Sequence, residues 1–222
     1  MPQYLSRGST HGSQPPIQTG PVELSIVIDR SASMASLATV AIAGFNTLLA
    51  EQKKLLAPTR FSLSLFSDVV ETVHDGLPIG EVASMEQADY RPNGSTALYD
   101  GIGAAIEKVG DRMDPSPHPA RVLIAILTDG NENCSARFSK QEIFDQICYR
   151  RNACGWQFLF MGAGSNPVPT GLSLGIQRSN IIEFGADVEG LSKMLLALSN
   201  AVRAYQLGDR GFALLLKEGS KT

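Results

Sequence analysis

The sequence predicts an α/β protein of three layers, in which a mostly parallel sheet carries helices on both faces and an antiparallel hairpin at one edge. From Val22 onward, short apolar runs alternate with longer segments of helical periodicity, which is the pattern of a parallel sheet. The run VLIAILT at residues 122–128 is apolar at nearly every position, as expected for a central strand covered on both faces. With 222 residues, 43% of them hydrophobic, the chain suits one domain with a sizeable core.

Three further apolar runs predict strands: LSIVID at 24–29, FSLSLF at 61–66 and WQFLFMG at 156–162. FSLSLF alternates between apolar and polar residues and then turns at Ser67 and Asp68 into VVETVHD. Alternation followed by such a turn is typical of a hairpin with one solvated face. We therefore expect this pair to form the antiparallel edge.

The helices are predicted from apolar stripes and from their end signals. Gly110 is expected to end the second stripe, Ser139 with Glu142 forms a capping box, and Asp187 can cap the last helix. The first two stripes consist of Leu37, Val40, Ala41, Phe45, Leu48, Leu49, Leu55 and Leu56, and of Leu98, Ile102, Ala105, Ile106 and Val109.

Both ends of the chain differ from the middle. Residues 1–20 are rich in Ser, Gly, Pro and Gln, so we expect a disordered arm that can be removed without loss of the fold. The domain is predicted to cover 21–207. The tail, 208–222, contains an apolar run after Gly211 and is expected to dock on the domain, with partner binding as the alternative.

Composition narrows the classes of partner and compartment. A formal net charge of −3 provides no general attraction to nucleic acid or acidic lipid. No stretch approaches about 20 apolar residues, and the first 20 residues lack a signal peptide's apolar region, so we expect a cytoplasmic protein and no membrane. Cys134, Cys148 and Cys154 lack paired spacing and are interpreted as reduced thiols.

Oxygen-bearing side chains gather where apolar strands are expected to end. Asp29, Ser31 and Ser33 follow the first strand, Thr96 precedes the second long helix, and Asp129 follows the central strand. In an open parallel sheet, ligands bind at the carboxyl ends of strands where the chain order reverses. If the first and central strands are neighbours, Asp29 and Asp129 face each other.

This set of two carboxylates and three hydroxyls selects Mg²⁺, Mn²⁺ or Ca²⁺ over zinc or copper, and Mg²⁺ is the expected cellular ion. So few protein ligands would leave part of the coordination sphere to water. A carboxylate from outside could take such a position, because an under-neutralised cation and nearby helix N-termini both favour negative charge.

The pattern of Asp29, Ser31 and Ser33, then Thr96 in GST, then Asp129 in TDG resembles the metal-ion-dependent adhesion site, or MIDAS, of von Willebrand factor A domains. The resemblance covers about residues 22–207, although Ala32 replaces a glycine often found there. It implies a three-layer, Rossmann-like fold and a non-enzymatic binding module completed by a partner's acidic residue. Small stand-alone domains of this kind resemble bacterial or phage cytoplasmic proteins, some of which work beside AAA-type ATPases or stress-resistance systems.

Several alternatives stay open on sequence alone. Asp and Ser are favoured helix N-caps, so a lone DxSxS pattern could be only a capped helix. A metal-dependent hydrolase of phosphate esters would need a general base, and Glu132 is the only candidate in the motif loops. An inert structural component is the third class. Asp100 could brace the metal loops or be a solvated first-turn acid, and Arg30 could contact an acidic partner or be an ordinary surface residue.

Overall fold

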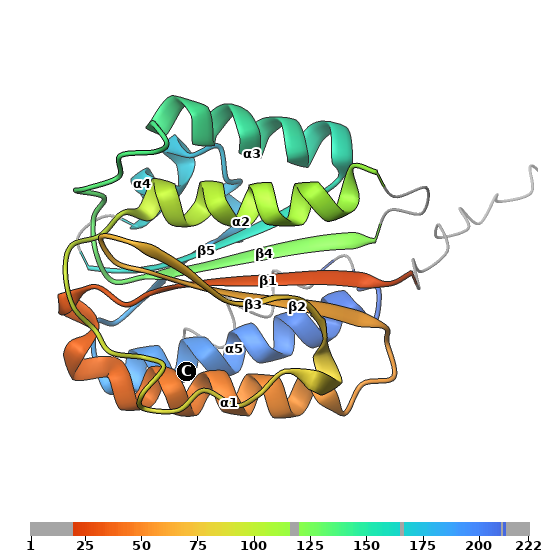
Figure 1. Ribbon diagram of the computed structural model, residues 1–222, viewed down its shortest axis with the longest axis horizontal. Helices are drawn as coiled ribbons and strands as arrows, with labels where there is room; N and C mark the ends of the chain where they lie inside the picture. The colour runs from red at the N-terminus through yellow and green to blue at the C-terminus, as the bar shows by residue number, and fades with distance from the viewer. Residues whose placement is uncertain (1–19, 116–119, 165–166, 210, 212–222) are drawn as a thin grey trace, which may run out of the picture.

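The computed structural model describes residues 20–115, 120–164, 167–209 and 211. Six strands form one sheet in the order β3-β2-β1-β4-β5-β6, and only the β2–β3 pair is antiparallel. Helices cover both faces, with α2 and α3 on one side and α1 and α5 on the other (Figure 1). The predicted three-layer α/β fold with an antiparallel edge hairpin is confirmed. The expected arm, 1–20, and tail, 208–222, lie almost wholly outside the described residues.

Five of the six described strands occupy the predicted segments, and β6 was not predicted from the sequence. The central pair is β1 (Val22–Asp29) and β4 (Arg121–Thr128), and every residue of β1 is buried. On one side of this pair lie β2 (Thr59–Phe66) and β3 (Val70–Pro78), and on the other lie β5 (Gln157–Ala163) and β6 (Ile181–Phe184). Because β1 leads to β2 on one side and β4 continues on the other, the chain order reverses between β1 and β4.

The helices on one face are α1 (Ala38–Lys53), which follows a 3₁₀ turn at Ala32–Leu37, and α5 (Val188–Gln206). Asp187 caps α5 as predicted, accepting a hydrogen bond from the Gly190 backbone N–H at 2.7 Å. The first apolar stripe ends earlier than predicted, because α1 stops at Lys53 and Leu56 is completely exposed.

The opposite face carries α2 (Leu98–Met113), α3 (Lys140–Cys154) and the short α4 (Pro167–Ser173). The capping box of Ser139 and Glu142 opens α3 as predicted. Gly110 does not end α2, which continues to Met113, so that prediction was wrong. Gly110 instead permits a close helix contact, since a Cβ there would lie 2.5 Å from an Arg150 guanidinium nitrogen.

One helical segment, Ala32–Lys53, is long and apolar enough by length and composition to span a membrane, with a mean hydropathy of 1.5 over its best window. The expectation that no stretch approaches this limit was therefore wrong. The same segment packs on the sheet through Phe45, Leu48 and Leu49, each 1% exposed. Its place in the core accounts for its apolar composition.

Candidate metal centre

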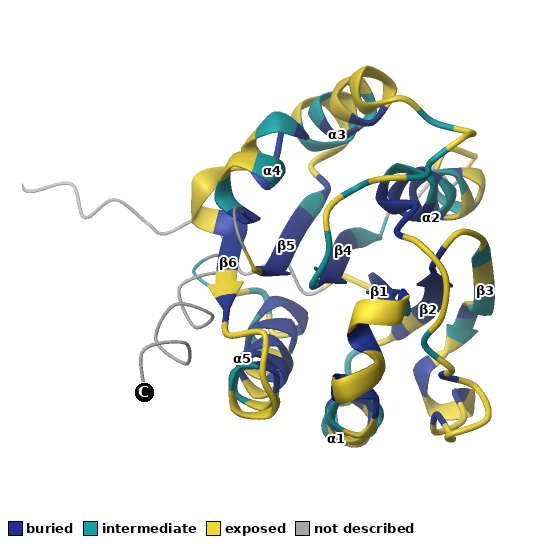
Figure 2. Ribbon diagram, turned by 90° about the vertical axis from the view of Figure 1, so that its left-hand side faces the viewer, coloured by how far each residue is buried: buried dark blue, intermediate teal, exposed yellow. Residues whose placement is uncertain are grey.

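Three loops meet at the carboxyl ends of β1 and β4, the end of the sheet that faces the viewer in Figure 2. The first loop carries Asp29, Ser31 and Ser33, the second carries Thr96, and the third carries Asp129. Backbone hydrogen bonds join them: the Ala32 N–H donates to Gly94 O at 3.1 Å, and the Asn133 N–H donates to Thr96 O at 3.1 Å. The predicted residues are thus brought to one place by the backbone itself.

Asp29 is the most deeply buried residue of this site and has no exposed surface. Its Oδ1 accepts a hydrogen bond from the Ser31 backbone N–H at 2.7 Å, and its Oδ2 accepts one from the Thr128 hydroxyl at 2.6 Å. The Tyr90 hydroxyl donates to the Asp29 carbonyl at 2.5 Å. The carboxylate is therefore held in one orientation from both sides.

The hydroxyls of the first loop connect the two carboxylates. Ser31 Oγ lies 3.0 Å from Ser33 Oγ, and Ser33 donates its hydroxyl hydrogen to Asp129 Oδ1 at 2.6 Å. Neighbouring ligands of an octahedral ion with bonds of 2.0–2.1 Å are about 2.9 Å apart. The separation of the two serine oxygens therefore fits two adjacent positions around one such ion.

The helix-cap interpretation of DxSxS is tested by Ser31. This residue is at the N-cap position of the 3₁₀ turn, but its side chain makes no capping hydrogen bond. Its hydroxyl is directed to Ser33 instead. The capping role that Ser residues commonly have at such positions does not explain this serine.

Thr96 approaches the site beside Gly130. A Cβ at Gly130 would lie 3.0 Å from Thr96 Oγ1 and 3.7 Å from Asp29 Oδ2, so both oxygens border the space above this glycine. The Thr96 side chain is buried, and its backbone N–H donates to Asn133 Oδ1 at 2.9 Å. The site accordingly brings together all five residues predicted from the sequence.

Burial raises the pKa of Asp29 above its ordinary value, and the charge of Asp129 adds to this effect. Hydrogen bonds from Thr128 and Ser31 act in the opposite direction. Two nearby carboxylates with no counter-charge repel each other, and a divalent cation between them would remove that repulsion. The donor set fits such a cation, because hydroxyl and carboxylate oxygens are ligands for hard divalent ions.

Among the described residues, no three His, Cys, Asp or Glu side chains gather into a cluster of metal ligands. This finding agrees with the composition of the site, which has two carboxylates and takes its remaining oxygens from hydroxyl groups. The geometry therefore favours a cation that accepts neutral oxygen ligands over one that prefers imidazole or thiolate.

Two acids near the site act as braces. Asp100 accepts hydrogen bonds from the backbone N–H groups of Ala136, Arg137 and Phe138 at 2.9–3.0 Å, which favours bracing over a solvated role. Glu132 accepts four hydrogen bonds, from the N–H groups of Tyr99, Cys134 and Ser135 and from the Ser135 hydroxyl. Both carboxylates hold the loop that follows Asp129.

Sequence reasoning missed four contributors to the site: Thr128, Tyr90, Asn133 and Gly130. Thr128 could have been suspected, since it directly precedes Asp129 in the TDG motif. Tyr90 and Asn133 lie in irregular segments with no periodicity, and only the folded chain shows their contacts. For Arg30 the sequence left two roles open, and in the structure its guanidinium pairs with Glu71 at 2.8 Å while its side chain is 14% exposed.

No protein-family model and no curated protein sequence matches the chain. Solved structures do match it. Proximal thread matrix protein 1 from the mussel byssus, solved with a zinc-occupied MIDAS motif, has a TM-score of 0.59 at 16% identity over 82% of this chain. The ArnB paralogue VWA2 from Sulfolobus acidocaldarius has a TM-score of 0.53 at 20% identity, also over 82%.

The chain has the von Willebrand factor A fold. A von Willebrand factor type A protein from Catenulispora acidiphila is a further match, with a TM-score of 0.52 and 18% identity over 82% of this chain. The chain spans 42 to 48% of the lengths of these three structures. At these low identities, the structural matches establish a shared von Willebrand factor A fold and not a shared partner.

Proposed function

We propose that this von Willebrand factor A domain is a protein-binding module whose MIDAS holds Mg²⁺ and receives an acidic residue of a partner. The observation that carries the proposal is the hydroxyl pair of Ser31 and Ser33, 3.0 Å apart, free of any capping bond and linked directly to Asp129. The zinc-occupied MIDAS of the mussel protein supports a divalent ion at the corresponding place.

Each residue has a defined part in this proposal. Ser31, Ser33 and Thr96 would supply neutral oxygens, while Asp29 and Asp129 would supply negative charge directly or through water. Two carboxylates only balance a divalent charge, and five side chains leave room for an outside oxygen. The bound ion would attract a carboxylate there, and Ser33 and Asp129 are the more exposed members of the set.

The hydrolase alternative needs a free base, and the candidate that the sequence offered is already engaged. Glu132, the candidate base, already accepts four hydrogen bonds within its own loop. A general base must instead be free to accept a proton from a bound water or substrate. His74 belongs to β3 and contacts Phe61, with ring centroids 6.5 Å apart, so it is part of the packing of the edge hairpin. We therefore propose binding without turnover.

The expected partner is a protein with an accessible Asp or Glu, of the kind offered by an AAA-type ATPase or a stress-resistance component. A cytoplasmic location belongs to the same proposal, and the three free cysteines, Cys134, Cys148 and Cys154, are compatible with it.

The test is a pull-down from the native organism, run in Mg²⁺ and in EDTA, with wild-type protein and with Thr96→Val, Thr96→Ser and Thr47→Val. Thr47 is an exposed threonine of α1 whose hydroxyl bonds only to its own helix, so Thr47→Val is the matched control. We expect EDTA and Thr96→Val to abolish capture, and Thr96→Ser and Thr47→Val to retain it. Capture that is unchanged in EDTA would contradict the proposal and favour an inert scaffold.

A screen for phosphatase and esterase activity completes the test. We expect no turnover that depends on both the metal and Thr96. Metal-dependent hydrolysis lost in Thr96→Val and kept in Thr47→Val would replace the binding module with the hydrolase.

A further inference from the structure

A cavity of about 650 Å³ lies at the opposite end of the sheet from the MIDAS, where β1 and β2 begin. Its walls are largely apolar, and four prolines, Pro21, Pro58, Pro78 and Pro115, belong to its lining together with Met113. Its charged lining residues are Glu23, Arg60, Asp111 and Arg112. Small-molecule sites typically have volumes of about 300–1,000 Å³, apolar walls and a few polar groups.

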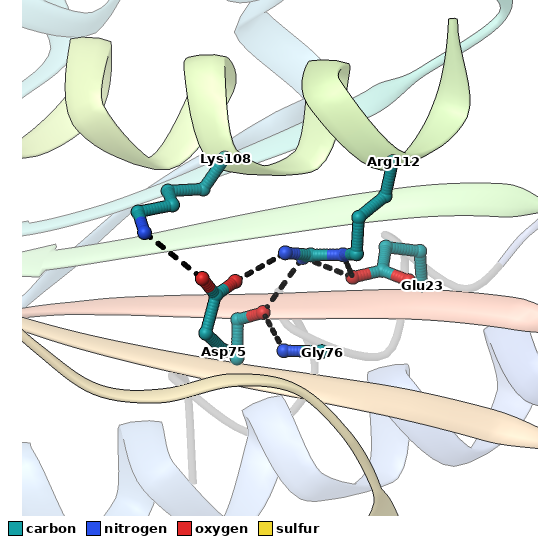
Figure 3. Close-up of polar contacts among 6 residues, drawn as sticks. Glu23, Asp75, Gly76, Lys108 and Arg112 are labelled. Atoms are coloured by element: carbon teal, nitrogen blue, oxygen red, sulfur yellow. Dashed lines mark hydrogen bonds and ion pairs between the residues drawn. The ribbon is translucent and has the colours of Figure 1, made fainter. Parts of the chain in front are cut away.

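Glu23 is unusual among these residues, because it is a carboxylate with no exposed surface inside a β-strand. Its Oε1 accepts hydrogen bonds from Arg112 Nε at 3.1 Å and from Arg112 Nη2 at 2.5 Å (Figure 3). Its Oε2 is buried and has no hydrogen-bond partner among the described residues. A buried charged oxygen without a donor costs free energy, so it favours a ligand that supplies one.

The neighbouring charges do not supply this donor. Arg112 divides its guanidinium between Glu23 and Asp75, and it also donates to Ser62 Oγ at 2.9 Å. Asp75 lies between Arg112 and Lys108 and pairs with Lys108 at 2.9 Å, as Figure 3 shows. These contacts use four N–H groups of the Arg112 guanidinium, and none of them is donated to Glu23 Oε2.

A second buried polar atom lies on the same face of β1. Ser25 is two residues after Glu23, and its hydroxyl oxygen also lacks a partner among the described residues. Residues two apart in a strand point to the same side of the sheet. An ammonium group carries three N–H donors and a positive charge, so it matches a buried carboxylate oxygen better than a neutral hydroxyl does.

We propose that this cavity binds a small organic amine, with the ammonium group on Glu23 Oε2 and the apolar body against the proline and methionine walls. Because Glu23 has no exposed surface, binding requires a side chain of the cavity lining to move. Met113 and Arg60 line the same cavity and are flexible enough for this movement. The site is separate from the MIDAS, since Glu23 and Asp29 are at opposite ends of β1, about 20 Å apart at the rise of a strand.

The test uses n-butylammonium as the probe, with n-butanol and butyrate as matched probes of the same chain length. Binding is followed by the backbone amide signals of Val22 and Thr59 in ¹⁵N–¹H spectra of the whole protein. We expect saturable shifts with n-butylammonium, at least about tenfold weaker binding of n-butanol, and none of butyrate, because a hydrogen bond to a charged group is worth a factor of ten or more.

Two variants separate the site from general effects. Glu23→Gln keeps the size of the side chain and removes its charge, and we expect it to weaken n-butylammonium binding about tenfold. Ala120→Phe places a ring at the lining and leaves the residues of the ion pairs unchanged, and we expect it to block binding. Ala153→Phe, at an exposed position of α3, is the matched control and should bind as wild type does.

Three outcomes would overturn the proposal. The first is equal binding of n-butanol and n-butylammonium. The second is unchanged binding in a folded Glu23→Gln or Ala120→Phe protein. The third is the lack of any saturable shift up to about 20 mM probe, a concentration at which even a weakly binding fragment should be detected. If Glu23→Gln does not fold, Ala120→Phe and the comparison of the three probes still decide the question.

Discussion

Thr128 donates a hydrogen bond from its hydroxyl to Asp29 Oδ2 at 2.6 Å and so joins the ends of β1 and β4 at the place where the chain order reverses. The same hydroxyl oxygen accepts a hydrogen bond from the Gly130 N–H at 3.1 Å. One threonine thus fixes both the buried carboxylate of the site and the start of the loop that carries Asp129. The orientation of the site follows from the neighbouring strands as much as from its own loops.

Replacing Thr128 by Val should destabilise the metal-free protein. Valine has nearly the shape of threonine, but it leaves Asp29 without one of its donors, and a lost hydrogen bond to a charged group costs about 1.5–3 kcal/mol. Urea unfolding in EDTA measures the change, with Thr47→Val as the control for the substitution itself. Equal midpoints for the two variants would show that the Thr128 bond carries no stability.

Asp129→Ala should have effects of opposite sign with and without the cation. In EDTA it removes the repulsion that Asp129 exerts on Asp29, and the hydrogen bond from Ser33 that it loses is exposed, so we expect a small gain in stability, within about 0.5 kcal/mol. In Mg²⁺ the variant should lack the stabilisation that wild type gains. Melting curves in both conditions test this, and an equal loss of stability in both would contradict it.

Asp100→Ala should loosen the loop between β4 and α3. The Asp100 carboxylate accepts three hydrogen bonds from the backbone N–H groups of residues 136–138. Removing it leaves these donors without their acceptor, which should lower the free energy of unfolding by about 1–3 kcal/mol. Glu107→Ala is the control on the same helix, because Glu107 forms only an exposed ion pair with Arg137, worth at most about 1 kcal/mol. Hydrogen exchange of residues 131–138 should accelerate in Asp100→Ala alone, and equal exchange in both variants would rule out a bracing role.

His74 should make the protein less stable in mild acid. Burial lowers the pKa of its imidazole, and the charge of Lys53 acts in the same direction, while a hydrogen bond at Ala83 and the charge of Asp89 oppose it. Above an unfolded-state pKa of about 6.5 both states are neutral. Below it the unfolded chain takes up a proton more readily than the folded chain, so the free energy of unfolding falls as the pH falls.

The measurement is the free energy of unfolding of wild type and His74→Gln at several pH values between about 7.5 and 5. As the pH decreases, wild type should lose stability relative to His74→Gln. A difference that stays constant over this range would show that His74 does not contribute.

Five strands and the five candidate ligand residues were predictable from the sequence for one physical reason. A buried parallel strand is mostly apolar, so an acid at its carboxyl end, such as Asp29 or Asp129, marks the edge of the sheet. Helix ends with side-chain caps, at Ser139 and Asp187, were equally visible. These signals are local, and the sequence contains them directly.

Features that depend on contacts between distant segments were not predictable. Gly110 has the sequence signature of a helix end, but its contact with Arg150 of α3 makes it an interior residue of α2. The pairing of Arg30 with Glu71 joins residues 41 positions apart, and Tyr90 reaches Asp29 across 61 positions. The Glu23 carboxylate likewise gave no local sign, since a glutamate at the start of a strand is ordinarily solvated.

Calorimetric titration of Mg²⁺ or Mn²⁺ into metal-free protein tests the central claim, that the five oxygens at the carboxyl ends of β1 and β4 hold a divalent cation. We expect one saturable site, lost in Thr96→Val and kept in Thr47→Val, and a gain of about 1 kcal/mol in stability when free ion exceeds the dissociation constant about fivefold. No binding at millimolar ion, or equal binding by both variants, would contradict a metal centre at this site.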